Sequence, residues 1–179
     1  MNSMTDNIRV IRLTQDYQFK SFDCGNQDLN DFLLSDSKPY LKKLLSVTYV
    51  LETDDDIVAY FSVSNDKISV PDSDKSTWRK IKALFPHSKH RSDYPAVKIG
   101  RLAVNQKYRG NGIGSDILNF VKEFFISDNR TGCSFVTVDA LREAIPFYLK
   151  NDFRYLDKRT AEVDTDTCMM YYNLTKLVD

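Results

Sequence analysis

Short runs of alternating apolar and polar residues occupy the N-terminal part of the chain, and stretches with helical spacing lie between them. Alternation rich in β-branched and aromatic residues predicts strands, and these are 8–13, 47–51 and 57–63. The polar turn 53–56 joins the last two strands, which we therefore expect to form a hairpin. Apolar residues recur at helical spacing from Leu29 to Leu45, where Pro39 interrupts them. Because proline breaks the interior of an α-helix, we predict two short helices there.

The C-terminal part of the chain predicts alternating strands and helices. A strand that ends at Val104 precedes a helix from Ser115 to Ile126. The later elements are a strand at 133–138, a helix at 143–151 with Pro146 in its first turn, and strands at 153–156 and 167–174. One apolar stripe on the 115–126 helix is assigned to the core, and it consists of Ile113, Ile117, Phe120, Val121, Phe124 and Phe125. This order predicts an α/β domain with a mixed sheet and helices on both faces.

Residues 66–95 carry three prolines and many charges, and they lack the apolar residues that a separate core needs. A short helix is predicted within them at 77–85. We therefore interpret the chain, 1–179, as a single domain with three parts. These parts are an N-terminal strand, helices and hairpin at 1–65, a basic excursion at 66–95, and a core with the C-terminal strands at 96–179.

The composition fits a folded domain and excludes few functions. With 179 residues, 42% of them hydrophobic, the chain is long enough for a substantial core. Lys+Arg and Asp+Glu each number 25, so the net charge of zero argues against a chain coated in nucleic acid but leaves room for a local basic patch. The cysteines, Cys24, Cys133 and Cys168, form no metal-binding pattern with the two histidines. We therefore expect unreactive or buried thiols and no metal. Because the chain shows no signal or membrane segment, we also expect a soluble cytoplasmic protein.

The segment 109–114, Arg-Gly-Asn-Gly-Ile-Gly, lies between the strand that ends at Val104 and the helix that follows. A glycine-rich turn before a helix lets backbone N–H groups approach a phosphate, which the helix N-terminus also favours. A dinucleotide loop would have glycine where Ser115 stands, and a Walker loop would end in Gly-Lys-Ser or Gly-Lys-Thr. A tight turn that only requires small residues is the structural alternative.

The pattern R-x-x-G-x-G in this segment resembles the pyrophosphate loop of the GNAT superfamily, the acetyl-CoA-dependent N-acetyltransferases. The resemblance implies a mixed, mostly antiparallel sheet in which a central pair of strands splays apart. The pantetheine arm of acetyl-CoA would pair there with main-chain groups of Leu102, Ala103 and Val104. The pyrophosphate would be held by Arg109, Gly110, Asn111, Gly112, Ile113, Gly114 and Ser115. Acetyl-CoA would be the cosubstrate, and no metal is implied.

A second segment, 144–153, resembles the GNAT pattern A-x-x-x-Y-x-x-x-G-F and aligns its tyrosine with Tyr148. In the family this tyrosine often protonates the departing coenzyme A thiolate, a role that suits a phenol, which stays protonated at neutral pH. The alternative is a helix tyrosine packed in the core. The chain departs from the family pattern at Asp152, where glycine is usual, and at Leu141, where many members have asparagine.

The sequence offers few candidates for a general base. A lysine acceptor, with a pKa of about 10.4, is almost wholly protonated at pH 7, whereas an α-amine with a pKa of about 7.7–8.0 is about 10% neutral. The four glutamates are Glu52, Glu123, Glu143 and Glu162, and none is expected in mid-strand beside the cleft. Asp139, at the end of a predicted strand, is the best carboxylate candidate, and a solvated strand end is the alternative. This scarcity favours an α-amine acceptor, attacked directly in a ternary complex.

The N-terminal segment 22–33 resembles the opening F-x-C/S-G-x-x-x-L-D/N-x-[WF]-L of one GNAT branch. This branch contains toxins that acetylate the α-amine of aminoacyl-tRNA and that are usually paired with a small antitoxin. The resemblance implies aminoacyl-tRNA as the acceptor, with small-molecule or protein amines as alternatives. Basic residues of the excursion would then contact tRNA phosphates. The alternative is a solvated helix face whose charges balance the phosphates of the coenzyme. These basic residues include Lys75, Arg79, Lys80, Lys82, Lys89 and Arg91.

Other functions stay open on the sequence alone. A non-catalytic module that senses acetyl-CoA or binds a partner would keep the glycine segment without acetyl transfer. A structural subunit would leave that segment unexplained. The apolar residues 169–172 belong either to the core or to a dimer edge, so a homodimer is also an expectation.

Overall fold

The computed structural model describes residues 7–87, 90–127, 131–162 and 165–178, and it divides into two compact units. The first unit comprises the chain up to Ser64 together with Ile99–Asn119, and the second comprises Asn65–Lys98 together with the chain from Phe120. Three elements continue from one unit into the other: β3 (Ile57–Ser69), β4 (Asp93–Val104) and α4 (Ile113–Ser127).

The first unit begins with an antiparallel sheet. β1 (Arg9–Arg12) pairs with β2 (Val47–Glu52), and β2 pairs with β3 in a register that places Tyr49 opposite Phe61. The predicted hairpin is confirmed, and its turn is closed by the Thr53 N–H, which donates to the Asp56 carbonyl at 3.0 Å.

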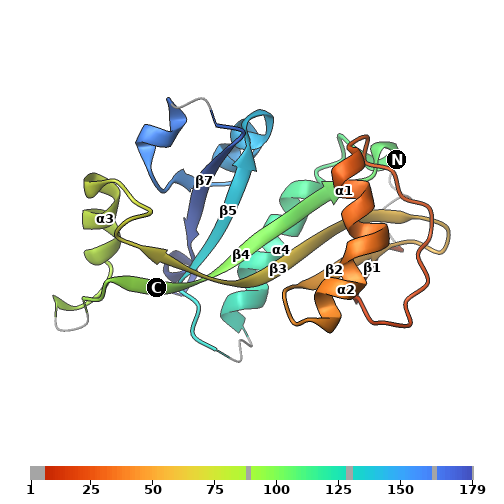
Figure 1. Ribbon diagram of the computed structural model, residues 1–179, viewed down its shortest axis with the longest axis horizontal. Coiled ribbons are helices and arrows are strands. Elements are labelled where there is room, and N and C mark those ends of the chain that lie inside the picture. The colour runs from red at the N-terminus through yellow and green to blue at the C-terminus, as the bar shows by residue number, and fades with distance from the viewer. Residues whose placement is uncertain (1–6, 88–89, 128–130, 163–164, 179) are drawn as a thin grey trace. The chain divides into compact units, whose positions relative to one another are not determined.

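Two helices, α1 (Gln27–Asp31) and α2 (Ser37–Lys42), lie over these strands (Figure 1). Side chains from the helical segment and the strands form one core cluster that includes Phe32, Leu33, Val50 and Tyr60. The phenol of Tyr60 donates to the Leu29 carbonyl at 2.7 Å, so this buried polar group is satisfied.

The helical segment differs from the prediction at Pro39. The chain continues from α1 to α2 without the expected break, and the irregularity is a π-helical turn at Phe32–Asp36. There the Ser37 N–H donates to the Phe32 carbonyl. Pro39 lies in the first turn of α2, where its missing N–H costs little, and the π-helical turn before it accommodates the ring.

The second unit contains the remaining elements. They are α3 (Lys75–Lys82), β5 (Phe135–Leu141), α5 (Ile145–Lys150), β6 (Arg154–Tyr155) and β7 (Thr167–Asn173). The strands and helices predicted here are confirmed; α3 begins two residues and ends three residues before the predicted 77–85, and Pro146 lies in the first turn of α5. β3 extends to Ser69 and β4 begins at Asp93, so both ends of the segment 66–95 are strand.

In the described part of the chain seven strands form one sheet, in the order β1-β2-β3-β4-β5-β7-β6. Its pairs β1–β2, β2–β3, β5–β7 and β6–β7 are antiparallel, which confirms the predicted mixed, mostly antiparallel α/β class. Residues 169–172 lie on β7, between β5 and β6, and Met170 is fully buried. The core alternative therefore holds for Met170, and β7 is not an edge strand of this sheet.

The apolar stripe on α4 is confirmed only in part. Ile113, Ile117 and Val121 are buried, but Phe124 is 42% exposed and stacks on Phe120. Leu118, absent from the predicted stripe, is fully buried. Within the described ranges, the structure has no helix of the length and apolarity that crossing a membrane requires.

Candidate functional site

The end of β4 leads into the glycine segment. Residues 102–104 are the last three of β4; Ala103 is buried and its two neighbours are half-buried. A short 3-10 helix, Gln106–Tyr108, follows, and α4 begins at Ile113, two residues before the predicted start. Ile113, Gly114 and Ser115 therefore form the first turn of the helix.

Two glycines give this loop its shape. Gly110 and Gly112 both have φ of +81°, a left-handed conformation that a residue with a Cβ adopts at a cost. A Cβ added at either position would meet no atom within 4 Å, so the glycines serve the backbone conformation and not the packing.

The loop presents a row of free donors. Within the described residues, the backbone N–H groups of 110–114 have no hydrogen-bond acceptor, and the first ones that do are those of Ser115 and Asp116, which donate to the Gly112 carbonyl. Alternating left- and right-handed residues followed by a helix N-terminus form a concave set of N–H groups that binds anions. The geometry of the loop thus fits a phosphate or pyrophosphate.

Asn105, which no sequence motif marks, fixes the chain just before the loop. Its side chain is buried, donates to the Ile57 carbonyl at 2.9 Å and accepts from the Lys107 N–H at 3.1 Å. Its own N–H donates to the Val58 carbonyl at 2.9 Å. The start of the loop is therefore tied to β3 through both backbone and side chain.

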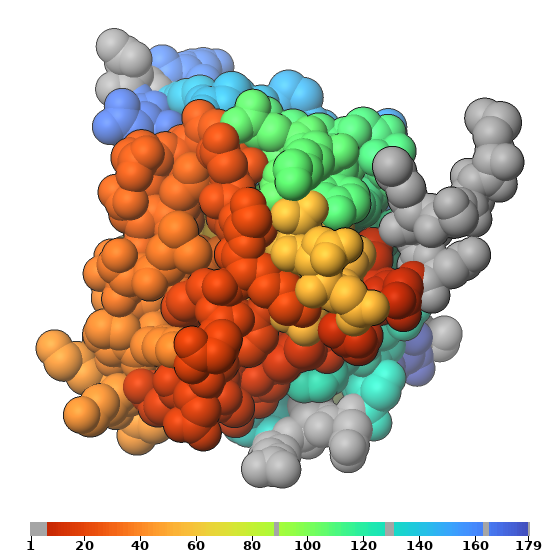
Figure 2. Space-filling view, turned by 90° about the vertical axis from the view of Figure 1, so that its right-hand side faces the viewer, coloured from red at the N-terminus to blue at the C-terminus, as the bar shows by residue number. Residues whose placement is uncertain are grey.

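The N-terminal segment 22–26 supports the loop from another side. The Gln106 side chain donates to the Asp23 carboxylate at 3.0 Å, and the Gln106 N–H donates to the Asp23 carbonyl at 2.9 Å. Figure 2 shows loop residues, in green, at the surface beside this segment, in red. A hydrogen bond from the Gly25 N–H, with others from Asn30 and Gln106, lowers the pKa of Asp23 and keeps this carboxylate charged.

The side chain of Arg109 takes part in the same contact. Its guanidinium donates to the Cys24 carbonyl. In the structure, therefore, the side chain of this predicted pyrophosphate ligand positions the loop, and its backbone N–H donates to the Gln106 carbonyl at 3.4 Å.

Tyr148 lies on α5, in the second unit, and its side chain is buried. Its ring packs edge-on against Phe147 and Phe153, with ring centroids 5.1 Å and 5.3 Å away. Burial raises the pKa of the phenol to about 12, and its hydroxyl has no hydrogen-bond partner among the described residues. A protonated, unpaired phenol is chemically suited to donate a proton to an anionic leaving group.

A family model for the acetyltransferase (GNAT) domain matches residues 45–155, which is more than half of the chain. The chain belongs to the GNAT acetyltransferase family. It is therefore an N-acetyltransferase, and acetyl-CoA is its acyl donor.

Solved structures share the fold of this acetyltransferase over nearly its whole length. A structure described as a bacterial toxin has 18% identity and a TM-score of 0.77, covering 96% of this chain and 93% of the other. A tyrosine-to-phenylalanine mutant of KacT has 22% identity and a TM-score of 0.75, with coverages of 96% and 98%. AtaT complexed with acetyl-methionyl-tRNAfMet has 19% identity and a TM-score of 0.74, again with coverages of 96% and 98%.

A buried lysine near the catalytic candidate was also missed from the sequence. Lys122 of α4 is buried, donates to the Asn151 carbonyl at 3.0 Å and lies 4.1 Å from the Tyr172 ring centroid. Because Asn151 caps α5, this lysine holds the end of the helix that carries Tyr148. Burial lowers the pKa of Lys122, an effect that the nearby Asp152 carboxylate opposes.

The candidate base Asp139 is already engaged. It lies inside β5 and not at the end of a strand, opposite Met169, and its carboxylate forms an ion pair of 2.5 Å with Lys98. Glu52, the one buried glutamate, is held by Arg9 and Lys20. Glu123, Glu143 and Glu162 are exposed.

No group of three or more histidine, cysteine, aspartate or glutamate side chains that could bind a metal is found where the structure describes the chain. The cysteines are free thiols; Cys24 and Cys168 are buried and Cys133 is half-buried.

Proposed function

We propose that this acetyltransferase moves the acetyl group of acetyl-CoA to the α-amine of aminoacyl-tRNA. Two observations support an acetyltransferase of this kind: the free N–H groups at the glycine loop and the unpaired phenol of Tyr148. The observation that carries the choice of acceptor is that Asp139, the candidate base, already forms an ion pair with Lys98, as the buried Glu52 does with Arg9 and Lys20. An acceptor that is partly neutral at pH 7 fits a site without a dedicated base.

In this proposal the loop residues 109–115 hold the pyrophosphate of acetyl-CoA. The N–H groups of 110–114 supply the donors, and Asn105, Asp23 and Gln106 keep them in place before the ligand arrives. The backbone of residues 102–104 would receive the pantetheine arm, as the family resemblance implies.

Tyr148 acts as the general acid. The thioester supplies the acetyl group, and the acceptor nitrogen forms the new C–N bond while the C–S bond breaks. Tyr148 gives its proton to the departing sulfur and recovers one from solvent, while the acceptor nitrogen loses its extra proton to water. Its raised pKa keeps the phenol protonated until the thiolate appears.

The length of the match to bacterial toxins supports this choice of acceptor. AtaT was solved with acetyl-methionyl-tRNAfMet and, in other structures, with acetyl-CoA and the antitoxin AtaR. By analogy we propose that this acetyltransferase is a toxin and that a small antitoxin protein controls it.

The direct test is mass spectrometry of the RNA product. Purified protein is incubated with isotope-labelled acetyl-CoA and a panel of charged tRNA, uncharged tRNA, lysine peptides and polyamines. We expect labelled N-acetyl-aminoacyl-adenosine after nuclease digestion of charged tRNA alone. Labelled peptides or polyamines with unlabelled charged tRNA would overturn the choice of acceptor.

Expression in cells tests the toxin proposal. The wild-type protein should arrest growth, and Tyr148→Phe should relieve the arrest at an equal protein level. Equal arrest by the variant would remove Tyr148 from its proposed role.

A further inference from the structure

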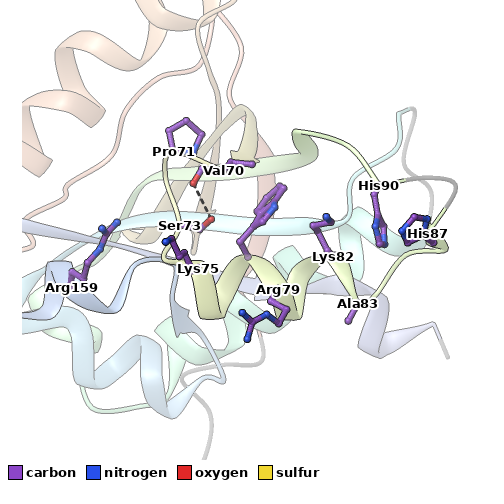
Figure 3. A pocket seen from close by; sticks show the side chains of 11 residues that line it. Val70, Pro71, Ser73, Lys75, Arg79, Lys82, Ala83, His87, His90 and Arg159 are labelled. Carbon is purple, nitrogen blue, oxygen red and sulfur yellow. Dashed lines mark hydrogen bonds between the residues drawn. The ribbon is translucent and has the colours of Figure 1, made fainter.

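An open pocket of about 740 Å³ lies beside α3, within the second unit, and we call it the α3 cavity. It is bounded by α3, by the chain before and after this helix, and by Arg159 (Figure 3). Figure 3 places Arg159 at one end of the cavity and His87 and His90 at the other. The volume lies in the range of small-molecule and nucleotide pockets.

The α3 cavity is positively charged. Lys75, Arg79 and Lys82 line it, and none of them has an ion-pair partner in the part of the chain that the structure describes. Arg159 differs, because its guanidinium is bound to the Asp157 carboxylate at 2.6 Å. No aspartate or glutamate is among the described residues that line the cavity. Three uncompensated cations around one hollow favour an anionic ligand.

The cavity also has an aromatic wall. Trp78 lines it and is half-buried, and its ring lies 5.7 Å from the Tyr94 ring. Tyr94 also stacks on Phe85, with ring centroids 4.2 Å apart. Trp78 therefore packs against a cluster of aromatic side chains that contact one another. An indole held in this way is a fixed surface for stacking a planar base.

Hydrogen bonds of the Asp74 side chain fix the start of α3, the helix that lines the cavity. The Asp74 carboxylate accepts hydrogen bonds from the N–H groups of Ser76 and Thr77, both at 2.9 Å, and thereby caps α3. It also accepts from the Lys158 N–H at 3.1 Å, which ties the helix to the segment that carries Arg159. The cap therefore fixes the backbone from which the side chains of Lys75, Arg79 and Lys82 extend around the hollow.

From these features we infer that the α3 cavity binds an unpaired nucleotide of the acceptor RNA. The base would stack on Trp78, and the flanking phosphates would contact Lys75, Arg79 and Lys82. The inference rests on the proposed function, because it takes the RNA of the acceptor as the ligand. An acidic peptide would use the cations but would leave the indole without a planar partner, and so RNA fits the cavity better.

Trp78 makes the inference measurable, since it is the single tryptophan of the chain. Stacking of a base quenches indole emission. Titration of the wild-type protein with uncharged tRNA, with a short single-stranded RNA and with free mononucleotides should give quenching that saturates with the RNA ligands. Acetyl-CoA alone should leave the emission unchanged.

A charge variant tests the phosphate contacts. In K75Q/R79Q/K82Q we expect a Kd for tRNA about tenfold or more higher at physiological salt, and a salt slope shallower by about two to three. The matched control K42Q/K43Q/K176Q removes the same charge at exposed positions that do not line the cavity, and it should keep both values. Trp78→Phe preserves an aromatic ring for packing and should bind RNA more weakly; because no tryptophan remains, its Kd is measured by direct RNA binding and not by quenching.

Several results would overturn the inference. The first is RNA binding that leaves Trp78 emission unchanged, and the second is an equal loss of affinity in the control variant. The third is saturable quenching by free mononucleotides but not by RNA. The fourth is quenching by an acidic peptide at a lower concentration than by RNA. If charged tRNA is acetylated while K75Q/R79Q/K82Q retains wild-type affinity, the inference fails and the proposed function stands. If the wild-type protein neither binds nor acetylates tRNA, the proposed function itself fails.

Discussion

The glycine loop and the α3 cavity, the two anion sites proposed above, present different parts of the polypeptide to a ligand. The loop uses backbone N–H groups that two glycines with positive φ expose. The cavity uses the side chains of Lys75, Arg79 and Lys82 on a capped helix. The first arrangement is sensitive to backbone conformation, whereas the second is sensitive to charge and salt.

This difference matters for a reaction with two anionic substrates. A backbone site offers donors at fixed positions and suits one compact group such as a pyrophosphate. A cluster of flexible cations suits a polyanion, whose binding weakens steeply as salt rises. Substitutions should therefore separate the two sites.

The largest effect is expected from Tyr148→Phe, which leaves both anion sites intact. Loss of the general acid should lower kcat about 100-fold or more, while the KM values for both substrates change less than about threefold. Steady-state kinetics with acetyl-CoA and charged tRNA measure this. A higher KM for either substrate with an unchanged kcat would assign Tyr148 to binding instead.

A smaller effect, on one substrate, is expected from Gly112→Ala. The added Cβ finds open space, so the cost of about 1–2 kcal/mol comes from the left-handed backbone alone. If the loop relaxes to avoid this strain, its N–H groups diverge, and the KM for acetyl-CoA should rise about tenfold while the KM for tRNA stays the same.

Gly132→Ala is the matched control for this substitution. It also adds a Cβ that meets nothing within 4 Å, but at a glycine without positive φ, and it should behave as the wild type. Equal kinetics for the Gly112 and Gly132 variants would show that the conformation of the loop does not matter.

Asp74→Ala removes the side chain that caps α3 and should lower the free energy of unfolding. Burial alone would raise the pKa of Asp74, but hydrogen bonds from the Thr77 and Lys158 N–H groups outweigh it and lower the pKa to about 2. Because the folded pKa lies below the unfolded value, the stabilisation is complete above about pH 4 and is lost as the pH falls towards 2.

Denaturant unfolding of the wild type and of this variant measures how much the Asp74 cap contributes to the free energy of unfolding. The variant should be less stable by about 1–2 kcal/mol at pH 6, and the difference should disappear near pH 2. Asp74→Asn, which also accepts hydrogen bonds at a helix start, should restore part of the loss. A difference that does not depend on pH would exclude the carboxylate as its source.

The smallest effect is expected from Asp139→Asn. If the acceptor needs no base, kcat should fall less than about threefold, because Asp139 only forms a partly exposed ion pair with Lys98. The rate should still rise with pH around the pKa of the acceptor α-amine, about 7.7–8.0. A loss of about 100-fold together with a changed pH profile would make Asp139 the base.

The sequence predicted the parts of the site that local chemistry determines. The segment 109–114 follows from glycine and helix-start patterns, and the structure gives Gly110 and Gly112 the positive φ that such a turn requires. Pro146 in the first turn of α5 follows from the chemistry of proline in the same way.

Residues that act across long sequence distances could not be predicted. Asn105 bonds to Ile57 and Gln106 to Asp23, and no local pattern marks such pairs. The break expected at Pro39 moved to a π-helical turn because packing of Phe32 and Leu33 keeps the segment helical. The sequence predicts Lys122 as a surface residue of its helix, because the contact with the Tyr172 ring joins residues far apart in the chain.

The most direct test of two separate anion sites is a two-substrate kinetic analysis of acetyl transfer by Gly112→Ala and K75Q/R79Q/K82Q. We predict a higher KM for acetyl-CoA alone in the first variant and a higher KM for charged tRNA alone in the second. If either variant raises both KM values equally, or if K75Q/R79Q/K82Q changes neither, the division of the two substrates between the loop and the cavity is wrong.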